Sequence, residues 1–263
     1  MKHVPFPKLK MSLWQLLGPS IILTALALSG GELLIWPSVV ANHGFAILWA
    51  IPIVVLLQFF VNIEIERYTL VTGKSVEEDL VGQTHWLAIV FALAVLITLV
   101  WPAWITTAGN LISYLVFGTA SAYGLLVSIF LLILTLFVFK YRKTYGILEI
   151  IAKIGLTLTI LIIIAVVVLL FDKELFLEGL TGFTALGFIP QELPRFEFLG
   201  ALAFGGIAGV LNLVQSEWVL DKGYGVAGMK EKDAKNVEYT SKQSKKNFGQ
   251  WFRIINIEHF LVF

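Results

Sequence analysis

The sequence predicts an all-α integral membrane protein, and three observations predict it. Apolar residues make up 58% of the 263 residues, and charged residues make up only 14%, where about a quarter is usual in a soluble domain. The charges are clustered, so that no Asp, Glu, Lys or Arg occurs between Leu80 and Phe139. Several uncharged runs approach or exceed the length of about 20 apolar residues that a helix needs to cross a bilayer.

Six apolar spans follow one another along the chain, separated by charged or polar breaks. They cover residues 13–41, 45–62, 86–117, 123–139, 147–171 and 199–220. A seventh begins near Phe252, and the chain ends inside it, so we expect a chain truncated at its C-terminus. The predicted organisation is a tail (1–12), a five-helix set (13–171), an extracellular loop (172–198), a sixth helix (199–220), a cytoplasmic loop (221–250) and the start of a seventh helix (251–263).

The basic residues predict the orientation of these spans. With the N-terminus in the cytoplasm, the tail, the loops after the second and fourth spans and the 221–250 segment carry most of the Lys and Arg, and only Lys173 and Arg195 fall outside. Cytoplasmic loops carry the excess of positive residues. We therefore expect a multi-pass plasma-membrane protein with a cytoplasmic N-terminus. The polar composition of 221–250 predicts a mobile connection.

Composition and motifs also exclude several classes of function. The chain has no cysteine, which excludes disulfides, zinc thiolate sites and iron–sulfur clusters. It contains no His-Glu-x-x-His, no Gly-x-Ser-x-Gly and no phosphate-binding loop, so no enzyme and no cofactor are predicted. The net charge is only +1, and no nucleic-acid module is present. The expected partner is membrane lipid.

Glycines interrupt the first and the sixth span. The first contains Ser29-Gly30-Gly31-Glu32 followed by Pro37, and the sixth contains Gly205-Gly206-Ile207-Ala208-Gly209. A helix broken inside a membrane must line a cavity, because lipid cannot satisfy the freed backbone groups. Corresponding breaks in two sets of helices indicate an inverted-repeat secondary transporter. The alternative is that the glycines only let helices pack closely, since Gly205 and Gly209 have the spacing of a contact face.

Glu32 is the sharpest candidate for function, because an isolated carboxylate is costly inside a membrane unless something compensates its charge. It is expected to bind a cation or to carry a proton, although a side chain near a helix end can also reach headgroup water. Glu217 is the second candidate for proton coupling, with cytoplasmic water as its alternative environment. Asn212 and Gln215 share one helical face. The predicted substrate-binding residues are Ser29, Gly30, Gly31, Glu32, Ala208, Gly209, Asn212 and Gln215.

A family resemblance appears when the motifs are read together. Gly18-Pro19 opens the first span, residues 29–32 form its break, Gly44 and Trp49 open the second span, and Thr72-Gly73-Lys74 follows it. This pattern resembles the natural resistance-associated macrophage protein (NRAMP) family of proton-coupled divalent metal transporters. The resemblance implies an inverted-repeat bundle of the amino acid/polyamine/cation superfamily. It also implies that most of the second repeat is missing here and is encoded in a downstream segment.

The chain departs from that family at both of its characteristic motifs. The family's Asp-Pro-Gly-Asn is replaced by Ser29-Gly30-Gly31-Glu32, and its Met-Pro-His aligns with about Ala208-Gly209-Val210. The soft methionine sulfur, which helps to select manganese or iron, is therefore absent. Oxygen ligands from Glu32, Ser29 and Asn212 would suit a harder divalent cation, an amine or only a proton.

These observations lead to one function and two alternatives. The expected function is proton-coupled transport of a cation, with a divalent metal as the first choice, by alternating access between the broken helices. The first alternative is a membrane sensor or scaffold that keeps the bundle without transport and uses 221–250 to recruit partners or lipid. The second is an amine or amino-acid symporter of the same superfamily.

Overall fold

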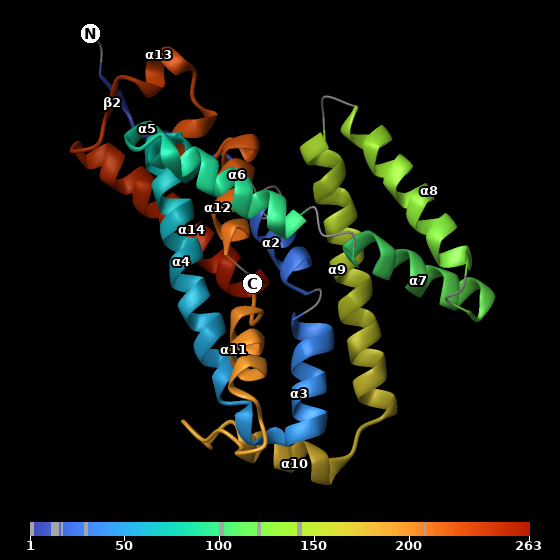
Figure 1. The fold of residues 1–263 in the computed structure, drawn as a ribbon. Helices are drawn as coiled ribbons and strands as arrows, with labels where there is room; N and C mark the ends of the chain where they lie inside the picture. The colour runs from blue at the N-terminus through green and yellow to red at the C-terminus, as the bar shows by residue number, and fades with distance from the viewer. Residues whose placement is uncertain are drawn as a thin grey trace. The chain divides into compact units, whose positions relative to one another are not determined.

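The structure is a computed structural model that describes residues 3–11, 16, 18–28, 31–99, 103–119, 122–140, 144–207 and 209–263. Contacts divide the chain into two units, one formed by Met1–Leu80 with Glu149–Phe263 and the other by Val81–Leu148. Helices dominate both units (Figure 1). The prediction of an all-α chain is confirmed, apart from one pair of two-residue strands.

The first unit contains both interrupted helices and the long helix α4. Its α-helices are α2 (Pro19–Ala27), α3 (Trp36–His43), α4 (Ala50–Thr72), α5 (Val76–Gln83), α9 (Thr144–Leu169), α10 (Lys173–Gly182), α11 (Arg195–Ala203), α12 (Val210–Lys222), α13 (Glu231–Ala234) and α14 (Lys242–Val262), of which α5 and α9 each extend across a unit boundary. The strands β1 (Val4–Pro5) and β2 (Val237–Glu238) pair in parallel. A π-helical turn (Gly31–Ile35) precedes α3, and 3-10 turns cover Phe45–Ile47 and Gly225–Gly228.

Three helical stretches of the described chain are long and apolar enough to cross a membrane: Pro19–His43, Phe45–Thr72 and Tyr145–Leu169. In α9, large apolar side chains such as Ile162 (62% exposed) and Val168 (71% exposed) lie on the surface. Soluble monomers rarely expose such continuous apolar surface, whereas lipid tails solvate it. This pattern is typical of a membrane-associated protein.

Helix α4 extends ten residues past the predicted end of the second span at Asn62. The charged residues that suggested an end do not interrupt the helix. Glu64 and Arg67 pair with each other on its exposed side, at 2.6 Å, while Ile65 and Leu70 remain buried. The helix ends at Thr72, because Gly73 adopts a left-handed conformation with φ 67° that glycine tolerates without strain.

The segment 221–250 is folded, so the expectation of a mobile connection is wrong. Tyr224 and Val226 are buried, and they share a core cluster with Phe6, Trp251 and other apolar residues. Helix α14 begins at Lys242, nine residues before the predicted start of a seventh helix, since the Ser241 side chain caps it by accepting a hydrogen bond from the Ser244 amide. Apolar residues spaced through a polar segment supplied enough buried surface to order it.

The predicted extracellular loop, 172–198, also contains helical structure. Helix α10 begins after Asp172, whose carboxylate accepts hydrogen bonds from the amides of Glu174 and Leu175. Near the other end of the loop, Leu193 and Phe198 pack with Trp36 and other residues in a second core cluster. These contacts join the segment before α11 to α3.

The second unit is described by itself. It contains α6 (Trp86–Leu99), α7 (Ala103–Phe117) and α8 (Ala122–Phe139). Residues 100–102, inside the predicted third span, lie outside the described residues. Helices α7 and α8 pack closely, because Gly109 faces the Gly124 carbonyl and Ser128, while Gly124 faces the Asn110 side chain. This is the small-residue contact typical of helices in membranes.

Candidate functional site

The first interrupted helix changes its geometry at the predicted break. Helix α2 ends at Ala27, and the chain resumes as the π-helical turn from Gly31 to Ile35 before α3 begins. Single π-turns commonly mark functional sites, and Pro37 in the following turn has no amide hydrogen to donate. Gly31 is required here, because a Cβ atom at this position would overlap the backbone carbonyl of Phe204.

The second interruption separates α11 from α12. Helix α11 ends at Ala203, and α12 begins at Val210. Between them Gly206 has φ 105° and Gly209 has φ 59°, values that side chains other than hydrogen rarely allow. The glycines therefore break the helix, and they do not act only as a smooth contact face.

Two side chains satisfy backbone groups that the second break frees. Gln58 on α4 donates from Nε2 to the Gly205 carbonyl (2.9 Å) and accepts at Oε1 from the Ile207 amide (2.7 Å). Glu32 accepts at Oε1 from the Gly206 amide (2.5 Å). The carboxylate beside the first break thus contacts the backbone of the second, and the two breaks lie against each other. Gln58 is not among the substrate-binding residues that the sequence predicted.

Two polar oxygens at the breaks remain without a hydrogen-bond partner within the described chain. They are Oε2 of Glu32 and Oδ1 of Asn212, and both are buried atoms. Asn212 lies in the first turn of α12, where its backbone amide donates a hydrogen bond to the Gly209 carbonyl (3.3 Å). Buried polar atoms normally have partners. Unpartnered oxygens next to broken helices are therefore candidate ligands for a cation or a proton.

The remaining predicted site residues have different outcomes. Ser29, Gly30 and Ala208 lie outside the described residues. Gln215 does not join the breaks, because its Nε2 donates to Glu66 (2.6 Å). Glu217 is exposed, which favours the alternative of a surface position over a buried proton-coupling role.

A second group of polar side chains is buried where four helices meet. Glu66 on α4, Glu258 and His259 on α14, Ser20 on α2 and Gln215 on α12 are each at most 3% exposed. The Ser20 hydroxyl lies 2.5 Å from Oε2 of Glu258, 3.0 Å from Nδ1 of His259 and 3.5 Å from Oε1 of Glu66. Ligand atoms of the two glutamates and the histidine lie within 4.8 Å of one another, an arrangement that can hold a metal ion.

Sequence reasoning missed this cluster, although two signals were present. Asn62, Glu66 and Thr69 recur with helical spacing, and all three are buried on α4; ending the second span at Asn62 hid that face. In the same way, Ile255 and Glu258 lie on one face of α14. What no sequence pattern could show is that these two faces meet.

The C-terminal half of α12 is also held by ion pairs and hydrogen bonds that do not involve the buried group around Glu66. Lys222 donates from Nζ to both carboxylate oxygens of Glu149 (2.7 Å each), and Lys153 donates to the same carboxylate (2.6 Å). The Ser216 hydroxyl donates to Oε2 of Glu77 at the start of α5 (2.6 Å). Burial raises the pKa of the Glu77 carboxyl, and the hydrogen bond from Ser216 acts in the opposite direction.

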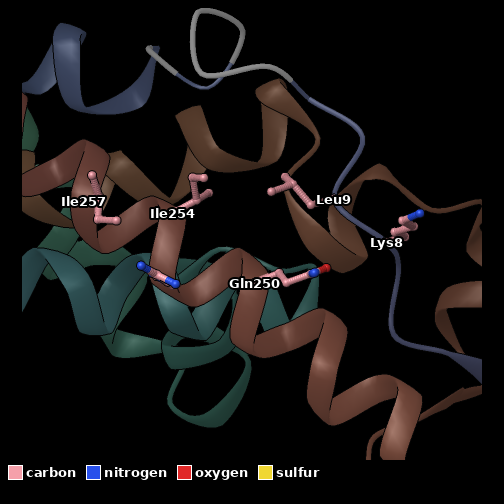
Figure 2. Close-up of a pocket in the computed structure, with 6 residues that line it drawn as sticks. Lys8, Leu9, Gln250, Ile254 and Ile257 are labelled. Atoms are coloured by element: carbon pink, nitrogen blue, oxygen red, sulfur yellow. The ribbon is translucent and has the colours of Figure 1, made fainter.

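A surface cavity of about 470 Å³ lies between the N-terminal segment and α14 (Figure 2). Its lining consists of Lys8, Leu9, Gln250, Arg253, Ile254 and Ile257. Two cations and three aliphatic side chains without a carboxylate do not suit a cationic substrate. This cavity is therefore separate in chemistry from both acidic sites.

Comparisons of the chain with protein-family models, with curated proteins and with solved structures found no match.

Proposed function

We propose that this chain belongs to a secondary transporter that binds a small cation between its two broken helices and moves it by alternating access. The proposal includes an inverted-repeat bundle similar to that of the NRAMP family, with protons as the coupling ion. A divalent metal ion is the first choice of substrate. The proposed location is the plasma membrane, which the chain crosses several times from a cytoplasmic N-terminus.

The observation that carries the proposal is the contact between the two breaks. Gly31 lies against the Phe204 backbone, and Glu32 accepts a hydrogen bond from the Gly206 amide. Non-helical backbone at membrane depth is tolerated only where protein or a watery cavity supplies partners. Pairs of discontinuous helices form the substrate sites of many secondary transporters. The contact therefore supports a site at the breaks more strongly than either glycine motif does alone.

Glu32 has the central role in this proposal. One carboxylate oxygen is held by the Gly206 amide, so the other, Oε2, is positioned, and it has no hydrogen-bond partner among the described residues. Oδ1 of Asn212 supplies a second oxygen from the other broken helix. Carboxylate and amide oxygens are ligands for hard divalent cations. An ammonium group would make the same contacts, so an amine is the second candidate substrate.

Uptake into proteoliposomes tests the proposal. The full chain is reconstituted, and uptake of Mn²⁺, Mg²⁺ and ethylamine is measured with and without an inward proton gradient. We expect uptake of one of these cations to rise with the gradient. The Glu32→Gln substitution removes the negative charge and should lower that uptake at least about tenfold, the cost of about 1.4 kcal/mol in binding.

The matched control is Glu178→Gln, which makes the same change on an exposed position of α10. Uptake that Glu32→Gln and Glu178→Gln leave equally unchanged would remove Glu32 from the mechanism. Absence of uptake for every cation would favour the sensor or scaffold function instead.

A further inference from the structure

Glu66, Glu258 and His259 come together from two helices that are distant in the sequence, α4 and α14. Ser20 of α2 and Gln215 of α12 complete the group, so that four helices converge on it. Glu66 and His259 are fully buried, and Glu258 is 3% exposed. Along α4, Glu66 lies eight residues after Gln58, which corresponds to about 12 Å of helix. The group is therefore separate from the contact between the breaks.

Several buried polar atoms of this group make no hydrogen bond among the described residues. The Ser20 hydroxyl has a single hydrogen but contacts Glu258, His259 and Glu66. Gln215 donates to Oε1 of Glu66. Oε2 of Glu66, Oε1 of Glu258, Oε1 of Gln215 and Nε2 of His259 are buried without a hydrogen-bond partner in the described part of the chain.

The unpartnered amide oxygen of Gln215 is an observation independent of the acidic pair. This side chain is fully buried, and its Nε2 donates to Oε1 of Glu66, so that its amide group lies beside the carboxylate. A buried amide oxygen without a partner is energetically unfavourable, because it has lost its hydrogen bonds to water. A cation bound beside Glu66 would offset that cost, whereas a further carboxylate would not.

The two carboxylates of this group are also not fully balanced by positive charges among the described residues. Among the described residues, the only group placed to form an ion pair with Glu66 is His259, with 3.8 Å between Oε1 and Nδ1, and this imidazole carries a positive charge only when it is protonated. Lys222 attracts Glu258 at longer range, but its ammonium is bound to Glu149. Two carboxylates in a buried site are strongly unfavourable when both are ionised without compensation. A divalent cation would compensate both at once.

The ligand types indicate the class of cation. Imidazole nitrogen suits zinc, iron and other transition metals, whereas carboxylate oxygen also binds manganese, magnesium and calcium. A set of two carboxylates and one imidazole therefore favours a first-row divalent ion over Mg²⁺ or Ca²⁺. Ligands bound at about 2.1 Å lie at most about 4.2 Å apart across the ion. The present spread, within 4.8 Å, requires only a small approach of the side chains.

We propose that Glu66, Glu258 and His259 bind a first-row divalent metal ion of the Mn²⁺, Fe²⁺ or Zn²⁺ type. Gln215 supplies a further oxygen, and the Ser20 hydroxyl orients Glu258 and His259. The ion joins α4 to α14 directly and draws in α2 and α12 through these two polar partners. This inference goes beyond the proposed transport function and does not rest on it, because the ion would be resident at a different place from the breaks.

Binding of Mn²⁺ to the purified full chain in detergent tests the inference. The free ion is counted from its electron paramagnetic resonance signal during a titration. We expect saturable binding by the unaltered protein and a loss of affinity of at least about tenfold in Glu66→Gln and in Glu258→Gln. Glu178→Gln is the matched control, since it makes the same change at an exposed position of α10 and should leave this site intact.

A second measurement keeps the test decisive where a variant fails to fold. Mn²⁺ bound to the unaltered protein should show magnetic coupling to a histidine nitrogen, and His259→Gln should remove it. Neither break contains a histidine among its described residues, so nitrogen coupling distinguishes this site from the proposed substrate site. Absence of nitrogen coupling, or binding that Glu32→Gln abolishes and Glu66→Gln leaves unchanged, would overturn the inference. Failure of uptake alone would affect only the proposed transport function.

Discussion

Replacing Gln58 by leucine should destabilise the protein, because this side chain satisfies two backbone groups of the break between α11 and α12. The substitution removes the hydrogen bond to the Gly205 carbonyl and the one from the Ile207 amide. Leaving a buried backbone group unsatisfied costs about 1 to 3 kcal/mol. Both contacts are only partly buried, so the lower half of that range applies to each. We expect the free energy of unfolding to fall by about 2 to 4 kcal/mol.

The measurement is unfolding of the purified chain in detergent micelles, followed by circular dichroism. Gln83→Leu is the matched control, because Gln83 is exposed at the end of α5 and makes the same chemical change without a bond to the break. Equal stability of Gln58→Leu and Gln83→Leu would refute the reasoning.

Two further predictions concern packing and pH. Gly31→Ala places a methyl group on the Phe204 carbonyl and should lower the melting temperature. Gly155→Ala in α9, where the added atom meets no described residue within 4 Å apart from the adjacent helix backbone, should leave the melting temperature unchanged or raise it, and a similar loss in both variants would contradict the packing argument. Because burial raises the pKa of Glu77, the folded state binds its proton more tightly, so this residue contributes stability at low pH that is lost as pH rises through the raised pKa. Glu77→Gln should therefore gain stability relative to the unaltered protein as the pH rises above 4.5, the ordinary pKa of this carboxyl, in paired melting curves, and a difference that stays constant with pH would contradict the assignment.

Local features of the sequence predicted more of the helices than of their contacts. The uncharged runs predicted apolar helices, and the glycines at 205–209 predicted a break that the structure shows. The predicted end of the second span was wrong, because charged residues were taken to mark the end of the helix. Glu64 and Arg67 face outward from a helix that continues to Thr72, since a helix can expose one polar face while burying another.

The prediction that residues 221–250 form a mobile connection was wrong for a related reason. Its polar composition is typical of a loop, but the few apolar residues within it, among them Tyr224 and Val226, pack on Phe6 from the other end of the chain. Average composition does not report such a long-range contact. Only the burial of particular side chains decided that the segment is folded.

The sequence by itself determined that this is a helical, membrane-compatible chain with two glycine-rich interruptions, because these properties depend on residues close together along the chain. The tertiary structure alone decided that Glu32 reaches Gly206 and that Glu66 meets Glu258 and His259. The physical reason is that hydrogen bonds and metal coordination act over about 2 to 3 Å. Whether residues separated by nearly two hundred positions approach that closely depends on how whole helices pack.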